Sequence, residues 1–402
     1  MARSLPIRAA DLRGAARLAT DATIGLTGLV EAMHERIARL PGWPAPQPTG
    51  RTTGITGLVY RTIRGVTHVV GGSLDALLGL LTPALAGEDT WPERDTLVAA
   101  LNGVLGDHLA ASANPLATPM TLRHGGQVLP PTREQLAAAL PEARASLLVL
   151  IHGLCMNEAA WSRGGADLGV ALAQALGFTP IHVRYNSGLP VARNGRELAQ
   201  QLDALCERWP RPVQRIVLLG HSMGGLVARS ALHCGEQARQ PWRGLVSDAV
   251  FLGTPHHGAP LERAGHWVDT VLGATPYAAP MARLGRLRSA GITDLRHGRV
   301  LDEPAPADSA SAHLPLPGDV RCFAAAASLG ERSDGLKTRL LGDGLVPPAS
   351  ALGRHRLKSR TLQFPPERQW VGQGLGHLDL LSAPAVQALL LRWLGPGAEA
   401  SG

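Results

Sequence analysis

The stretch LLGHSMGGLVARS, residues 218–230, constrains the fold of this chain more than any other. An apolar run ends at Gly220, and a helical pattern begins almost at once, so the backbone must turn sharply between them. Gly220-His221-Ser222-Met223-Gly224 fits the pattern Gly-x-Ser-x-Gly, in which a tight strand-to-helix turn presents a serine Oγ at the carboxyl end of a strand. Glycines at such a corner could also serve packing alone. The strand before it and the helix after it favour a nucleophile at Ser222, where the helix N-terminus stabilises developing negative charge.

From about residue 120 onward, short apolar runs alternate with amphipathic helical stretches, a rhythm that predicts a mostly parallel sheet with helices on both faces. The expected strands are SLLVLIHG (146–153), PIHVRYN (180–186), RIVLLG (215–220), DAVFLGTP (248–255), VRCFAAAAS (320–328) and SRTLQFPP (359–366). The rhythm breaks between residues 256 and 318, where an insertion with helical pieces predicts a lid or cap. Its apolar residues at helical spacing are Trp267, Val271, Leu272, Met281, Leu284 and Leu287.

The first part of the chain has a different texture, which predicts a helical accessory region at 1–120 preceding an α/β domain at 121–402. Helical spacing of apolar residues runs up to the proline-rich break at 41–50, and a third helix is expected at 94–109. Between them, residues 54–81 carry one apolar stripe: Ile55, Val59, Ile63, Val66, Val70, Leu74, Leu77 and Leu81. We expect this stripe to pack against neighbouring helices or the α/β domain, with peripheral membrane contact as the second alternative.

Composition excludes several classes of function. The formal charge is +7, but all except two of the 39 basic residues are arginines, scattered and without aromatic interleaving, which argues against a nucleic-acid surface. The four cysteines are widely spaced and have no matching histidine pattern, so neither a zinc site nor a disulfide framework is expected. The first residues have no apolar core of a signal peptide, and together with free thiols this favours a cytoplasmic protein.

A nucleophilic serine requires a base and a group that orients the base. Asp343, in the glycine-flanked loop LLGDGLVP, follows an expected strand, and His377, in GLGHLDLLSAP, precedes the last helix. These two complete the order Ser, acid, His. Asp334 and Asp379 are alternative acids, although Asp379 falls within the turn that carries His377 and is poorly placed to orient its ring.

The oxyanion of an acyl-transfer intermediate requires backbone N–H donors. We expect one from Met223, which follows the nucleophile, and one from Leu154 in the loop HGLCMN, where Gly153 permits a tight fold. Cys155 lies beside these residues without a histidine partner and is interpreted as a packing residue.

The segments IHGLCMNEAAW, GHSMGGLVARS, FLGTPHHGAP, GITDLRHGRVLDE, GDGLVP and GHLDLLS resemble the lipase and GPI inositol-deacylase-like branch of the α/β-hydrolases, as found in bacterial esterases. The resemblance covers about 145–395. It implies an α/β-hydrolase fold and an ester hydrolase working through Ser222, Asp343 and His377, with Leu154 and Met223 as oxyanion donors. His256 and His257 would be structural or pocket-lining. Some lipases of this kind hold calcium, but only Asp379 matches a ligand, so neither a metal nor another cofactor is expected.

Three functions remain in competition at this stage. The first is a serine ester hydrolase acting on hydrophobic or lipid-derived acyl esters. The second is an acyltransferase or thioesterase that uses the same three residues. The third is a scaffold whose N-terminal helices bind a membrane or a partner, which the complete set of three residues disfavours. The sequence leaves the physiological substrate and the oligomeric state open.

Overall fold

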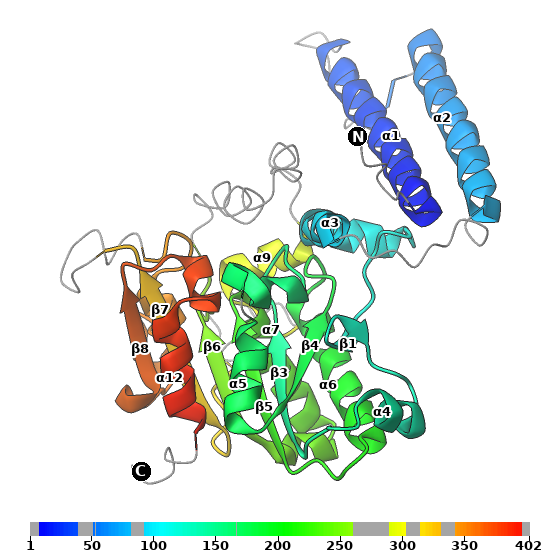
Figure 1. The fold of residues 1–402 in the computed structure, drawn as a ribbon. Coiled ribbons are helices and arrows are strands. Elements are labelled where there is room, and N and C mark those ends of the chain that lie inside the picture. Colours follow the sequence, from blue (N-terminus) through cyan, green and yellow to red (C-terminus); the bar gives the residue numbers. More distant parts are fainter. Residues whose placement is uncertain are drawn as a thin grey trace. The chain divides into compact units, whose positions relative to one another are not determined.

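The structure is a computed structural model that describes residues 8–38, 51–52, 54–81, 92–165, 167–259, 289–302, 314–330 and 342–395 (Figure 1). The chain forms two compact units. The helical unit comprises Met1–Trp91 and Leu109–Ala117, and the sheet unit comprises Pro92–His108 and Thr118–Gly402.

The sheet unit is built on an eight-stranded sheet in the order β2-β1-β4-β3-β5-β6-β7-β8. Strands β3 to β8 are parallel, and β1 pairs antiparallel with both β2 and β4. The strands are β1 (Thr121–His124), β2 (Gln127–Val128), β3 (Ser146–Ile151), β4 (Thr179–Arg184), β5 (Arg215–His221), β6 (Val246–Leu252), β7 (Arg321–Ser328) and β8 (Gln369–Gln373). The parallel arrangement confirms the fold class expected from the alternating rhythm.

Helices cover both faces of this sheet (Figure 1). The paired helices α5 and α12 lie on one face, where their apolar side chains form a core with alternate residues of the central strands, and the paired helices α6 and α7 lie on the other. These helices are α5 (Leu168–Leu176), α6 (Val191–Arg208), α7 (Met223–Gln237) and α12 (Pro384–Leu394). The shorter elements are α4 (Arg133–Ala139), η1 (Glu158–Gly165), η2 (Pro241–Leu245), α9 (Ala290–His297), α11 (Pro348–Ala351), η6 (Lys358–Arg360), η7 (Pro366–Arg368) and η8 (His377–Leu381).

The structure corrects the sequence analysis at one strand. Residues 359–366 are not a strand: they form parts of two short 3₁₀ helices and the extended link between them, and β8 begins only at Gln369. Pro365 and Pro366 explain the shift, because proline has no N–H to donate to a sheet ladder. The short β1–β2 hairpin was not predicted at all.

Only part of the expected insertion at 256–318 lies within the described residues. Its apolar residues from Trp267 to Leu287 all fall outside them. Helix α9 is described and contacts two loops that follow strands: Gly291 N–H donates to Gly188 O at 3.0 Å, and Gly258 lies against Arg296 O. Both loops leave the carboxyl ends of parallel strands, so α9 lies at that edge of the sheet.

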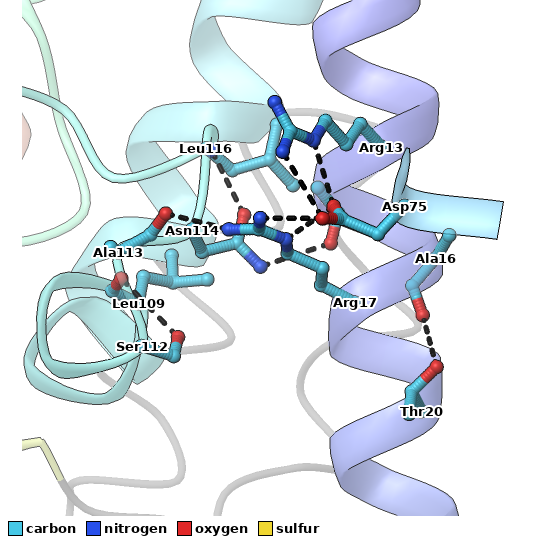
Figure 2. Close-up of polar contacts among 11 residues, drawn as sticks. Arg13, Ala16, Arg17, Thr20, Asp75, Leu109, Ser112, Ala113, Asn114 and Leu116 are labelled. Atoms are coloured by element: carbon cyan, nitrogen blue, oxygen red, sulfur yellow. Dashed lines mark hydrogen bonds and ion pairs between the residues drawn. The ribbon is translucent and has the colours of Figure 1, made fainter. Parts of the chain in front are cut away.

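The helical unit contains α1 (Ala9–Ala38), α2 (Gly54–Leu81) and the end of α3 (Pro92–Ala111), as expected for a helical N-terminal region. Polar groups hold α1 against α2 (Figure 2). The Asp75 carboxylate of α2 accepts from both Arg13 and Arg17 of α1, and Arg17 also donates to Ala113 O at 2.9 Å. At the other end of the pair, Arg64 forms an ion pair with the buried Glu31.

Asp75 should therefore govern the stability of the helix pair. Hydrogen bonds from Arg13 and then Arg17 hold the pKa of the Asp75 carboxyl well below its usual range. The stabilisation is complete above the pKa of an unfolded aspartate and is lost as the pH falls through the lower folded-state value. We expect Asp75→Asn to weaken the α1–α2 pairing by about 1 kcal/mol at neutral pH and to remove this acid dependence. Hydrogen-exchange protection of α1 and α2 amides, measured from neutral to acid pH, would show equal acid sensitivity in both proteins if the expectation is wrong.

Candidate active site

Ser222 occupies a strained turn between β5 and α7. Its backbone lies at φ 55° and ψ −122°, in a region that L-residues rarely adopt, and its N–H donates to Leu252 O at 2.8 Å. A Cβ at Gly224 would overlap the carbonyl oxygen of Ile151, and one at Gly220 would lie 2.6 Å from Gly225 Cα. The glycines therefore permit backbone approaches that no larger residue would allow.

The Ser222 side chain is fully buried, and its Oγ has no hydrogen-bond partner among the described residues. A buried hydroxyl without a partner costs free energy, which native proteins usually avoid. Strain and an unsatisfied hydroxyl at one residue mark a place that the surrounding fold maintains for a purpose other than stability.

Asp343 and His377 form a buried pair. Asp343 lies in the loop after β7, and His377 opens η8 after β8. The His377 Nδ1 lies 2.6 Å from Asp343 Oδ2, and the His377 backbone N–H donates to Asp343 O at 3.1 Å. The second carboxylate oxygen, Oδ1, accepts the N–H groups of Leu345 and Val346 at 2.9 and 2.7 Å. With both oxygens bonded, the carboxylate is fixed in place and orients the histidine ring.

The Asp343–His377 pair lies beside the Ser222 turn. The ring of His221, the residue before Ser222, lies 4.8 Å from the ring of His377, and its Nε2 is 3.1 Å from His377 O. Gly253, which follows the Leu252 carbonyl that holds Ser222, would place a Cβ 3.0 Å from the His377 ring. The structure thus brings together the serine, acid and histidine that the sequence indicated. The role of His221 as a link was not foreseen, although its place inside the Gly-x-Ser-x-Gly motif offered a signal.

The loop after β3 also reaches the serine turn. A Cβ at Gly153 would lie 3.2 Å from Ser222 Cβ, so Gly153 contacts the serine directly. The next residue in the chain, Leu154, is buried. The backbone N–H of the following residue, Cys155, donates to Ser187 Oγ at 3.0 Å, and this hydrogen bond fixes the loop. Cys155 itself has a positive φ of 60°. Ser187, absent from the sequence analysis, fixes this loop.

Helix α3, which lies within the helical accessory region expected at 1–120, supports the same loop. Gly103 lies directly against Cys155 and permits the contact, since a Cβ there would overlap the Cys155 Sγ. Gly106 accepts a hydrogen bond from the Asn186 side chain at 2.9 Å, and Ser289 before α9 donates to Gly103 O at 2.7 Å. The part of α3 within the sheet unit therefore packs on the residues that shape the surroundings of Ser222.

Burial removes charge from the groups around Ser222. It lowers the pKa of His152 to about 4 and lowers the pKa of His221 well below its ordinary value, with the charge of His377 as a smaller cause. Burial likewise raises the pKa of the Cys155 thiol to about 12. At neutral pH both rings and the thiol are therefore uncharged. All four cysteines are free, as the sequence analysis expected.

The other predicted residues have separate contacts. Asp334 lies outside the described residues. Asp379 accepts the N–H of Gly376 at 2.8 Å and caps the turn that carries His377. His256 stacks edge-on against Phe251 with ring centroids 5.0 Å apart, and the His257 ring bonds to Gly353 O at 2.9 Å.

The parallel sheet, the serine turn between β5 and α7, and the acid and histidine loops after β7 and β8 together define an α/β-hydrolase fold. Within it, residues 191–281 match the family model described as the PGAP1-like alpha/beta domain. This segment contains Ser222 but neither Asp343 nor His377.

Similar solved structures include lipases, esterases and a thioesterase. The mature lipase BlEst2 of Bacillus licheniformis is 19% identical over 62% of this chain and 91% of its own, with a TM-score of 0.40. An esterase of Pyrobaculum calidifontis is 14% identical over 64% and 78% of the two chains, with a TM-score of 0.38. The type II thioesterase YbtT of the yersiniabactin pathway is 17% identical over 64% and 96%, with a TM-score of 0.39. Among curated proteins, none matches the sequence.

The close approach of α7 to β3 yields a stability prediction. Gly224→Ala should force the backbone at Ile151 to move, and we expect a loss of about 1–3 kcal/mol or more in the free energy of unfolding. Gly244→Ala is the matched control, because a Cβ at Gly244 meets nothing within 4 Å. Urea unfolding of both variants beside the unchanged chain tests this. Equal midpoints for all three proteins would contradict the close approach.

Proposed function

We propose that this protein is a serine hydrolase that cleaves carboxylic esters through an acyl-enzyme. Ser222 is the nucleophile, His377 the general base and acid, and Asp343 the group that orients His377. The N–H groups of Met223 and Leu154 stabilise the oxyanion. The observation that carries the proposal is the buried Asp343–His377 pair, joined at 2.6 Å, beside a strained Ser222 whose Oγ has no hydrogen-bond partner within the described part of the chain.

The reaction would proceed in two halves. Ser222 Oγ attacks the ester carbonyl carbon as its proton passes to His377 Nε2, and the carbonyl oxygen becomes an oxyanion between the two N–H groups. When the intermediate collapses, His377 returns the proton to the leaving alcohol, and the acyl group stays on Ser222. Water then attacks the acyl-enzyme by the same route and releases the carboxylic acid. Asp343 remains ionised throughout and stabilises the imidazolium form of His377.

Hydrophobic acyl groups fit this site better than charged ones. Leu154 and Met223, the residues after Gly153 and after Ser222, have buried apolar side chains, and a Cβ at Gly153 would meet both Ser222 Cβ and Met156 Sδ within 3.4 Å. A charged acyl chain placed there would lose its hydration, and burial leaves the nearby His152 and His221 rings uncharged at neutral pH. Esters of fatty or other apolar acids are therefore the proposed substrate class.

The proposed roles predict that Ser222→Ala, Asp343→Asn and His377→Ala each remove most hydrolysis of p-nitrophenyl esters, by about 10³-fold or more. A fluorophosphonate probe should label the unchanged protein but not Ser222→Ala, because only an activated serine reacts. Asp379→Asn is the matched control: its carboxylate caps a turn, and most activity should remain.

Two outcomes would count against these assignments. If the folded, unchanged protein neither reacts with the probe nor hydrolyses any ester of graded acyl length, the hydrolase proposal is wrong. If Asp379→Asn abolishes activity while Asp343→Asn retains it, the acid is misassigned. Parallel assays with a thioester of the same acyl group, and with an added alcohol acceptor, separate ester hydrolysis from thioester hydrolysis and acyl transfer.

The buried Cys155 provides a further prediction. With its thiol pKa raised to about 12, it is protonated at neutral pH and cannot act as a nucleophile. Cys155→Ala should therefore retain fluorophosphonate labelling and ester hydrolysis to within about tenfold, the loss coming only from looser packing against Gly103. Loss of all activity in a variant that still unfolds cooperatively would require a chemical role for this thiol.

A further inference from the structure

The outer side of α2 is apolar and exposed. Leu58, Val59, Ile63, Val66, Val69 and Val70 form what we call the α2 flank, and each side chain is between 41% and 69% exposed. Thr62 and Ser73 complete this side of the helix, and no charged residue interrupts it. The stripe expected to pack against neighbouring helices thus turns away from α1. Its remaining members, Ile55, Leu74, Leu77 and Leu81, have side chains outside the described set.

Helix α1 has a corresponding outer side. Leu12, Leu26, Leu29 and Val30 form the α1 flank and are between 45% and 62% exposed. At about 100° per residue, these positions lie roughly 100–160° around the helix from the residues that face α2. The residues that face α2 are Arg13, Arg17, Thr20 and Glu31, and on α2 the corresponding ones are Arg64, Gly71 and Asp75. The α1 flank and the α2 flank therefore look in opposite directions.

This distribution is the reverse of a helix pair that packs in water. The charged side chains between α1 and α2 satisfy each other, and Gly71 lets the helices approach closely where it lies against Thr20. Thr20, Thr23 and Thr27 donate their hydroxyls to carbonyl oxygens one turn earlier on their own helix, at 2.7–2.9 Å. Helices in an apolar solvent need their charges paired with each other, a small residue where they touch, and hydroxyl groups bonded within their own helix. The α1–α2 pair has all three features.

We propose that the helical unit binds an anionic lipid surface, with α1 and α2 lying in the boundary between headgroups and acyl chains. Two apolar flanks facing opposite ways cannot both be covered by one flat partner, whereas lipid surrounds an inserted pair on both sides. No helix within the described residues is long and apolar enough to cross a bilayer, so the pair would lie along the surface rather than span it.

The charge of the two helices fits anionic headgroups. Residues 8–38 and 51–81 contain seven arginines and five carboxylates, with no lysine. Arg61 is exposed outside the α2 flank, where a long side chain can keep its guanidinium among phosphates while its stem contacts acyl chains. The excess positive charge is small, so the apolar flanks should supply most of the binding and the arginines the preference for anionic lipid.

Vesicle flotation tests the proposal. The full chain carrying Ser222→Ala is mixed with vesicles of phosphatidylcholine alone or with one third phosphatidylglycerol, so that the outcome is independent of catalysis and of the proposed function. We expect it to float with the anionic vesicles and less with the neutral ones. Val66→Glu with Val70→Glu on the α2 flank, and separately Leu26→Glu with Leu29→Glu on the α1 flank, should each lower the partition coefficient by about tenfold or more.

Val371→Glu is the matched control, since it places the same charge on a partly exposed valine of the sheet unit and should float like the parent. A chain that stays at the bottom with both kinds of vesicle overturns the proposal. The proposal is also overturned if only one of the two flank variants loses flotation, because the partner would then cover one flank and not both. Sedimentation without vesicles tests whether a second copy of the chain covers the flanks. If the flank variants turn an oligomer into a monomer and leave flotation unchanged, self-association and not lipid binding covers them, and the proposal is wrong.

Discussion

The structure of the sheet unit depends on the contact between the β5–α7 turn and the end of β3. Gly224 lies directly against Ile151 O, and Gly225 against Thr254 in the loop after β6, so three neighbouring segments meet at one corner. This packing holds Ser222 at a positive φ, because relaxing that residue would separate α7 from the sheet. Strain at one residue is thus maintained by contacts distributed over the centre of the fold.

Other parts of the site are positioned relative to that corner. The carbonyl of Leu252 holds the Ser222 N–H, and the next residue, Gly253, lies against the His377 ring. His221, fixed by the same turn, contacts His377 from the strand side. The histidine loop is therefore placed by the serine turn as well as by Asp343, which explains how a loop late in the chain meets a turn in its middle.

The sequence sufficed for the fold class because the parallel strands are buried and read as apolar runs with helices between them. It failed at β8, a partly exposed edge strand whose short pattern, QWVGQ, is no stronger than the proline-containing run before it. The β1–β2 hairpin was missed for the same reason, since two- and four-residue strands carry too little periodicity. The residues of the site could be named from loop position and chain order, but not their supports. Ser187, Asn186 and Gly103 have no local signature, because their function comes from contacts between segments 30 to 80 residues apart.

The helical unit shows a further limit of periodicity as a guide to packing. An apolar stripe at helical spacing is usually taken to face the protein interior, and the Val59–Val70 stripe has that spacing. The direction in which the stripe faces is set by the positions of the charged side chains, which need oppositely charged partners. The described ion pairs of Asp75 and Glu31 are with arginines of the opposing helix, and an ion pair with charge-assisted hydrogen bonds holds a geometry that interchangeable valines do not. Because the carboxylates determine which sides of α1 and α2 meet, the valines lie on the sides that face away from the helix contact. Ion pairs on the inner side and valines on the outer side are therefore one arrangement, and a substitution that freed the carboxylates would also release the constraint that keeps the apolar flanks exposed.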